Sequence, residues 1–346
     1  MRQITGEPAA TVARRLMWLD AARGIGIVLV VYAHGARALV DVLPFLGAFK
    51  AIDTLVYAFH MQLFFFLAGL VSVKSLNQSR KSYLGRKFGT VIYPYVLWSA
   101  IYWLLETLFA SRVNSPLDYD AILWIWLHPI EHLWFLYVLF FCQLLAAFTW
   151  PRVALLTLLS GWMLLGPLPP INVPAFWTQF PWFITGLVLA PRFLAGAPTR
   201  EIEAGGGLVL GVFLAAIAAA VFGQLDLAAL AKFAMAGVGI SLTVAAAYLV
   251  RRVRPVTYLG EASLSIYLMH TIFSAGVREL LEIVFPVGGL VLLAITVVAG
   301  VLLPLIVHEA ARRSGVAPYF GLGRMAPGPR EQRRIECDPK ELTHTV

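Results

Sequence analysis

The chain has 346 residues, of which 60% are hydrophobic and only 13% are charged, and its mean hydropathy is +0.78. Soluble domains carry about 25% charged residues, so this composition excludes an ordinary soluble protein. The formal net charge of +8 comes from basic residues scattered between apolar runs, which does not favour a nucleic-acid partner. Cys142 lies inside an apolar run and Cys337 lies near the C-terminus, so no disulfide is expected.

Ten apolar runs are long enough to cross a bilayer as helices, since a span needs about 17–25 residues. We expect them at residues 18–43, 51–73, 88–110, 132–149, 153–169, 176–194, 205–223, 229–250, 256–277 and 287–308. The sequence therefore predicts an all-α integral membrane protein, a bundle of about ten transmembrane helices within residues 1–311. Residues 312–346 are rich in Gly, Pro and charge, which predicts a disordered cytoplasmic tail.

The basic residues predict the orientation of the bundle. With the N-terminus inside the cell, 22 of the 27 Lys and Arg residues fall on the inner segments. Because positive charge accumulates on the cytoplasmic side, both termini are expected there, in a multi-pass protein of the inner (plasma) membrane.

The first apolar run carries ionisable residues, among them Asp20, Arg23, His34 and Arg37. Such groups are costly at bilayer depth, so they are expected to face the protein interior and to serve a function. On a helix, Arg23 and His34 lie within about 20° around the axis and about 16 Å apart along it. One side of this helix is therefore expected to line a polar site. The alternative for Asp20 and Arg23 is a simple ion pair at the end of the helix.

The second apolar run contains His60. If the first two helices form a hairpin that turns near Gly47, His34 and His60 each lie 13 residues from the turn, at the same depth. His60 could instead simply bond a neighbouring helix. The histidines show no short metal-ligand spacing and the glycines no P-loop pattern, so neither a metal site nor nucleotide hydrolysis is expected.

Six segments resemble a known family in the expected order. They read WLDAARGIGIVLVVYAHG, AFHMQLFFFLAGLVS, YPYVLWS, HLWFLYVLFF, FPWFITGLVL and LGEASLSIYLMH. The chain resembles the membrane-bound acyltransferase 3 family over about residues 17–310, and Arg23 and His34 meet its Arg-x10-His pattern. Within the family, these segments resemble most the branch of fucose O-acetylases and exopolysaccharide acyltransferases. The resemblance implies a ten-helix enzyme that moves an acyl group from cytoplasmic acyl-CoA to a glycan hydroxyl.

Transfer from a thioester to a hydroxyl requires a base, and the pKa of histidine suits that task near neutral pH. We expect His34 to be the general base, Arg23 to position the donor and Asp20 to orient Arg23. Arg86 and Lys87 end a basic loop that could meet the CoA phosphates, or they could be cytoplasmic anchors only. Many relatives carry an Arg-x-x-Arg element here, but this chain has Gly89 in place of the second Arg.

Further candidates lie nearer the outer surface, where an acceptor would arrive. Glu131, His132 and Trp134 open the fourth run, and His270 ends SLSIYLMH in the ninth. We expect His60 and these four residues to line the site or bind the acceptor. Alternatively Trp134 belongs to the interfacial aromatic belt.

Three other polar residues in the later helices have weaker assignments. Ser265 and Tyr267 are expected to form hydrogen bonds between helices. Glu106 could pair with Arg112 or with Arg37.

The sequence thus predicts a membrane O-acyltransferase, most simply an O-acetyltransferase, that modifies a surface or exported polysaccharide. It would use acyl-CoA as co-substrate, no cofactor and no metal. Its partners would be the acyl-CoA donor, the carbohydrate acceptor and the bilayer. The alternative is a secondary transporter or flippase for a glycan or lipid-linked intermediate, which explains buried charge equally well. Transporters are often built from repeated halves, however, and no repeat is visible here.

Overall fold

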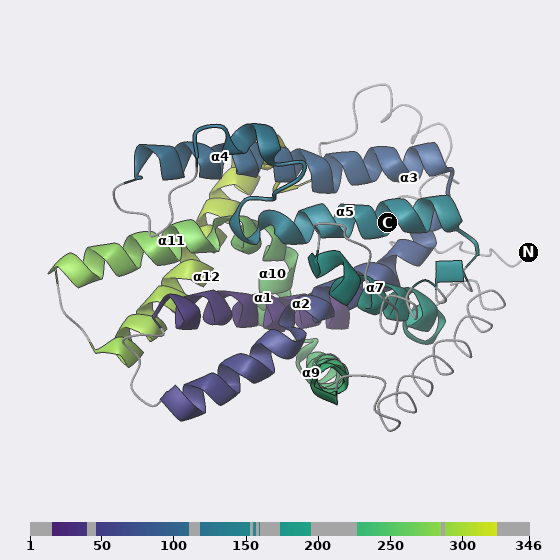
Figure 1. Ribbon diagram of the computed structural model, residues 1–346, viewed down its shortest axis with the longest axis horizontal. Helices are drawn as coiled ribbons and strands as arrows, with labels where there is room; N and C mark the ends of the chain where they lie inside the picture. The colour runs from purple at the N-terminus through teal and green to yellow at the C-terminus, as the bar shows by residue number, and fades with distance from the viewer. Residues whose placement is uncertain are drawn as a thin grey trace, which may run out of the picture.

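The computed structural model describes residues 16–39, 46–110, 118–152, 174–194, 227–284 and 288–323, with three further positions at 155, 156 and 159. Every regular element within these ranges is helical, which confirms the predicted all-α class. Figure 1 shows several long helices running side by side.

The described helices follow one another along the chain. They are α1 (Met17–Ala38), α2 (Leu46–Leu76), α3 (Arg80–Lys87), η1 (Phe88–Ile92), α4 (Tyr93–Leu108), η2 (Ala121–Trp124), η3 (Glu131–Leu133), α5 (Trp134–Thr149), α7 (Pro174–Phe193), α9 (Leu227–Val250), α10 (Arg254–Glu261), α11 (Ser263–Val284), α12 (Gly289–Arg313) and η4 (Ala317–Phe320).

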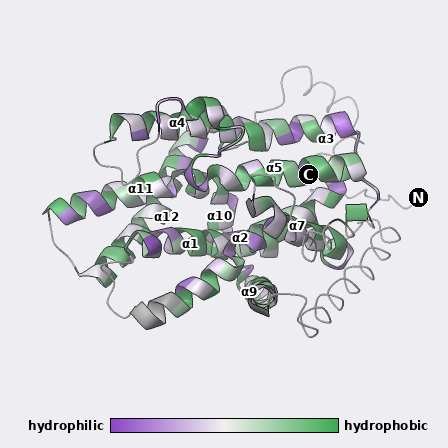
Figure 2. Cartoon of the chain, viewed as in Figure 1, coloured by the Kyte–Doolittle hydropathy of each residue, from purple (hydrophilic) through white to green (hydrophobic). Residues whose placement is uncertain are grey.

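Six helical segments are long and apolar enough to cross a membrane. They are Met17–Ala38, Ala51–Leu76, Arg80–Leu108, Glu131–Thr149, Ala231–Val250 and Gly289–Arg313. Figure 2 shows hydrophobic residues dominating the long helices, with hydrophilic positions near the free ends of α3 and α11. Helix α7 lies on the predicted span 176–194, and α11 overlaps most of the predicted span 256–277. The predicted span 205–223, and nearly all of 153–169, lie outside the described residues. The count of ten spans and the orientation stay predictions.

Three boundaries differ from those expected. The third span begins at Arg80, not at residue 88, because α3, η1 and α4 form one continuous helical segment. The ninth predicted span is divided at Ala262, where α10 ends and α11 begins. The turn predicted near Gly47 is wrong, since Gly47 lies inside α2, and α2 crosses α1 obliquely (Figure 1).

Helix α1 is at the centre of the packing, in contact with α2, α9, α10, α11 and α12. Its closest neighbour is α10. A Cβ added to Gly24 would lie 2.1 Å from the Val256 carbonyl oxygen, and one added to Gly260 would lie 1.8 Å from the Asp20 carbonyl oxygen. Lipid tails give helices no hydrophobic reason to associate, so small residues that allow close backbone contact provide the van der Waals attraction instead.

Helices α2 and α7 cross in the same reciprocal way. A Cβ on Gly69 would lie 2.0 Å from the carbonyl oxygen of Phe183, and one on Gly186 would lie 2.0 Å from that of Phe66. Each glycine therefore receives the backbone of the other helix, and the two crossings fix the separation of α1 from α10 and of α2 from α7.

The structure continues beyond residue 311. Helix α12 ends at Arg313, and the following segment returns to the start of α4. Tyr93 donates its hydroxyl to the Tyr319 carbonyl (2.6 Å), and the Trp98 indole N–H donates to the Phe320 carbonyl (3.0 Å). Residues 314–323 thus pack as part of the bundle, and the remainder of the predicted tail, 324–346, lies outside the described residues.

The crossing of α2 and α7 predicts a strong effect of one methyl group. Gly186→Ala should lower the free energy of unfolding by about 1–3 kcal/mol, because the new Cβ must push two backbones apart. The measurement is thermal unfolding in detergent, with Gly276→Ala as control, since a Cβ at Gly276 meets nothing within 4 Å. Equal stability of the two variants would contradict the close crossing.

Candidate functional site

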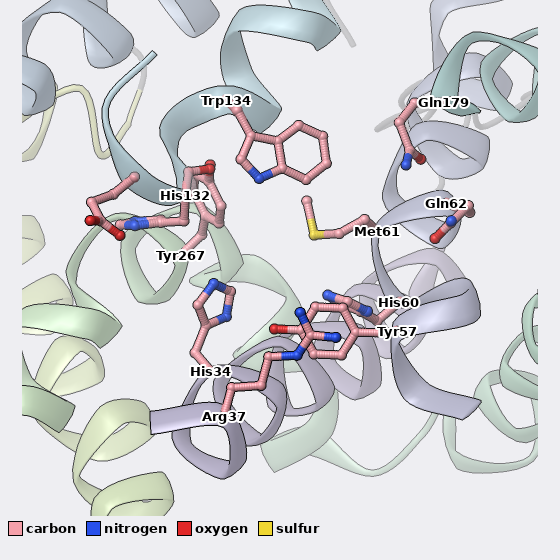
Figure 3. Close-up of a pocket in the computed structure, with 11 residues that line it drawn as sticks. His34, Arg37, Tyr57, His60, Met61, Gln62, His132, Trp134, Gln179 and Tyr267 are labelled. Carbon is pink, nitrogen blue, oxygen red and sulfur yellow. The ribbon is translucent and has the colours of Figure 1, made fainter. Parts of the chain in front are cut away.

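A cavity of about 430 Å³ lies between α1, α2, α7, α11 and the segment that leads into α5. The lining side chains are polar or aromatic with one methionine (Figure 3): His34, Arg37, Tyr57, His60, Met61, Gln62, Glu131, His132, Trp134, Gln179 and Tyr267. The volume falls within the range of about 300–1,000 Å³ that is typical of small-molecule sites. Of the predicted site residues, His34, His60, Glu131, His132 and Trp134 meet here.

Three imidazoles gather on one side of this cavity. The ring centroids of His34 and His270 are 4.9 Å apart, those of His132 and His270 are 5.0 Å apart, and those of His34 and His132 are 6.0 Å apart. The three rings come from α1, η3 and α11, so three separate helical elements build the cluster. His270 is fully buried and stands behind the other two without lining the cavity.

The backbone determines which ring nitrogen of His34 can act as a base. Its Nδ1 lies 3.0 Å from the Val30 carbonyl oxygen, one turn back along α1. Because a carbonyl oxygen can only accept, Nδ1 carries the proton and Nε2 keeps its lone pair. His60 repeats this arrangement on α2, with Nδ1 2.8 Å from the Val56 carbonyl oxygen.

The imidazoles of His270 and His132 each have at least one ring nitrogen without a hydrogen-bond partner in the described part of the chain. His270 donates from Nδ1 to the Tyr267 carbonyl oxygen (2.8 Å), and its Nε2 is buried without a hydrogen-bond partner in the described part of the chain. His132 is 5% exposed, and neither of its ring nitrogens has a partner there. Its backbone is held in place, since the Tyr267 hydroxyl donates to the His132 carbonyl. A neutral imidazole always has one N–H, so His132 holds a buried donor that no described group uses.

Arg37 extends the site toward the end of α1. Its guanidinium carbon lies 3.1 Å from the centroid of the Tyr57 ring, and it forms an ion pair with Asp53 at 3.3 Å. Arg37 therefore pairs with Asp53 of α2 and not with Glu106, which was one of the two partners considered for that acid. Glu106 is buried on α4, and its Oε2 has no partner within the described ranges. The other partner considered, Arg112, lies outside them.

Glu131 has an unusual backbone conformation, with φ at +44°. This left-handed region disfavours every residue with a Cβ, at a cost of about 1–2 kcal/mol. The strained residue directly precedes His132, at the point where the chain enters the bundle. Trp134 begins α5, where its indole lies beside the cavity (Figure 3) and stacks near Phe65 with centroids 6.4 Å apart.

The remaining predicted site residues lie away from the cavity. Asp20 and Arg23 form an ion pair at 3.7 Å, near the opposite end of α1 from His34.

The two basic residues expected to bind the donor lie at the end of α3. Arg86 donates to the Ser82 hydroxyl at 2.8 Å, and the Lys87 ammonium lies 5.3 Å from the centroid of the Tyr83 ring. Neither residue lines the cavity.

Ser265 bonds His308 across α11 and α12 at 2.7 Å, as expected of a polar residue that links helices.

Several lining residues were not predicted as part of the site. They are Tyr57, Met61, Gln62, Gln179 and Tyr267, the last of which was expected only to form hydrogen bonds between helices. Tyr57 could have been found from helical spacing, because it lies three residues before His60 on the same helix. Gln62 and Gln179 are neutral polar residues in apolar helices, which is a weaker signal. Among the described residues, no group of three or more His, Cys, Asp or Glu side chains is placed to hold a metal ion.

The family model of the acyltransferase 3 domain (Acyl_transf_3) matches residues 16–309, which includes the whole cavity. This chain belongs to the acyltransferase 3 family. No curated protein and no solved structure was found to match it. Family membership, together with the six apolar spans, identifies a multi-pass membrane acyltransferase.

The left-handed backbone of Glu131 predicts that glycine at this position is more stable than a residue with a Cβ. Glu131→Gly should make the acyltransferase more stable than Glu131→Ala by about 1 kcal/mol, since glycine alone adopts this φ without a Cβ penalty. Both variants remove the carboxylate, so comparing their thermal unfolding isolates the backbone effect. If the alanine variant were as stable as the glycine variant, the left-handed conformation would be wrong.

Proposed function

We propose that this acyltransferase moves an acyl group, most simply acetyl, from cytoplasmic acyl-CoA to a hydroxyl of a surface or exported carbohydrate in the inner membrane. The observation that carries the proposal is the hydrogen bond from His34 Nδ1 to the Val30 carbonyl, which leaves Nε2 as a base beside the cavity. Nε2 takes the proton of the acceptor hydroxyl as its oxygen attacks the thioester carbon. The tetrahedral intermediate then expels the CoA thiolate, and the imidazolium returns the proton to that sulfur.

His132 supports this reaction as a hydrogen-bond donor. Negative charge develops on the thioester oxygen during attack, and a preorganised donor in a water-poor site stabilises it strongly. The unpartnered ring of His132 lies beside His34 and supplies an N–H that is not committed elsewhere. His270, behind both rings, acts as a positioning residue.

The donor is expected to reach the site from the end of α1 that carries Asp20 and Arg23. Arg23 is about 16 Å from His34 along an unbroken helix, so it cannot touch the carbonyl that His34 serves. It suits the phosphates of CoA, which are separated from the thioester by the long pantetheine arm. Arg86 and Lys87 would add positive charge on the same predicted cytoplasmic side.

The acceptor is expected from the other side. His34 lies one turn before the end of α1, and Arg37 and the exposed Glu131 border the same cavity. With both termini cytoplasmic, this end of the bundle faces outward. Trp134 offers an aromatic face for a sugar ring.

Removal of the proposed base should nearly abolish transfer. In membrane vesicles with radiolabelled acetyl-CoA and glycan from the host envelope, His34→Ala should lower the rate by about 100- to 10,000-fold. His128→Ala is the matched control, because His128 is exposed and does not line the cavity. Transfer at the normal rate by His34→Ala would refute the assignment. A wild-type protein that transports glycan while the thioester stays intact would favour the transporter alternative.

Loss of Arg23 should weaken donor binding specifically. Arg23→Ala should raise the KM for acetyl-CoA about tenfold, since a hydrogen bond to a charged group is worth roughly 1.5–3 kcal/mol, and leave the KM for the acceptor unchanged. With acetyl-pantetheine, which lacks the nucleotide phosphates, the variant and the wild type should be equal. An equal loss with both donors would mean that Arg23 only stabilises the end of α1.

A further inference from the structure

Two glutamine side chains line the cavity on the side away from His34. Gln62 comes from α2 and Gln179 from α7, and Figure 3 shows them on the same side, across Met61 from the imidazoles. Gln179 is only 6% exposed. The amide oxygens of both residues are buried and have no hydrogen-bond partner in the described part of the chain.

Buried polar groups in native proteins are almost always bonded, and at the wall of a cavity a ligand can supply the missing partner. Some nearby polar groups are bonded, since His60 bonds the Val56 carbonyl and Thr185 bonds the Pro181 carbonyl. The ring nitrogens of His132, on the same cavity wall, have no partner in the described part of the chain. An amide does not titrate, so these two groups cannot reduce the cost by losing a charge. The Gln179 amide nitrogen donates to the Thr178 hydroxyl at 3.4 Å, but a group that arrives with the substrate would supply the partner that both amide oxygens lack at the wall of this cavity.

The chemistry of the amide indicates what that partner is. A primary amide has one acceptor and two donors, and its terminal torsion is soft, so either end can turn toward the cavity. A hydroxyl group, which both donates and accepts, is the natural complement. Two amides beside an indole face match a ring that carries several hydroxyls.

The charges of the cavity indicate a neutral ring. Arg37 and Glu131 are the charged residues in its lining. The guanidinium of Arg37 is already bound by Asp53 and covered by the Tyr57 ring. Among the described lining residues, the side with the two glutamines therefore offers no uncommitted cation for a carboxylate on the sugar.

We propose that Gln62 and Gln179 form the acceptor subsite, which holds an uncharged sugar ring through hydroxyls other than the one that reacts. The Trp134 indole supports the face of the ring, and the reacting hydroxyl points across Met61 toward His34. This inference rests on the proposed function, since it needs a carbohydrate acceptor. It adds two specificity-determining residues and a preference for neutral sugars.

The test is steady-state kinetics of the whole chain in lipid nanodiscs, with acetyl-CoA and the host envelope glycan. Gln62→Leu and Gln179→Leu should each lower kcat/KM for the glycan about tenfold, leaving the KM for acetyl-CoA unchanged. Thermal stability should be little changed, because leucine removes a buried amide oxygen that has no partner and, at Gln179, only a long hydrogen bond of 3.4 Å to Thr178. If a leucine variant fails to fold, Gln62→Asn or Gln179→Asn keeps the amide but shortens its reach.

Gln143→Leu is the matched control. Gln143 lies on α5, is 3% exposed and has an unpartnered amide oxygen, but it does not line the cavity. Its replacement should leave glycan kinetics unchanged. Wild-type kinetics in all three leucine variants would overturn the subsite, as would a rise in the KM for acetyl-CoA in place of the glycan. A wild-type protein that transfers no label would overturn the proposed function itself, a distinct result.

Soluble sugars test the preference for a neutral ring. Methyl glycosides of neutral hexoses should compete with the glycan in the wild type, and this competition should weaken in Gln62→Leu and Gln179→Leu. Competition by methyl glucuronide alone would overturn the neutral class.

Discussion

The whole arrangement depends on two places where helix backbones touch. Gly24 and Gly260 bring α1 against α10, and Gly69 and Gly186 bring α2 against α7. In a bilayer, apolar side chains gain little by leaving lipid for protein, so close contact between backbones has to provide the attraction. The cavity is bordered by α1, α2 and α7, so the crossing at Gly69 and Gly186 sets the separation of two of its walls, and the crossing at Gly24 and Gly260 packs the third wall, α1, against α10.

The same backbones also control the chemistry of the site. In hydrocarbon every polar group needs a partner inside the protein, and the imidazoles of His34, His60 and His270 meet this need by donating Nδ1 to a carbonyl of their own helix. Each ring is thereby held in one tautomer without a carboxylate beside it. An acid–base site built in this way needs little buried charge, which suits a reaction carried out within a membrane.

Much of the architecture could be predicted because lipid restricts a chain to long apolar helices. The site was predictable where an ionisable side chain interrupts such a run, as at His34, His60 and His132. The wall formed by Gln62 and Gln179 was not, because neutral polar residues are tolerated at many positions and only tertiary packing brings these two together. The depth argument for His34 and His60 had the wrong premise. Gly47 lies in α2 and not in a turn, and the two rings share a cavity because α2 crosses α1 obliquely.

The segment that follows α12 has a consequence for how the protein is made. It returns over more than two hundred residues to close on the start of α4, where Tyr93 and Trp98 bond the carbonyls of Tyr319 and Phe320. Gly321, at φ +68°, lets the chain turn tightly beside Pro94. During synthesis, α4 can complete these contacts only after residues 319–321 have been made. Since α4 also places Tyr102 against the His132 ring, at 5.1 Å between centroids, one wall around the imidazoles matures only after nearly all the chain has left the ribosome.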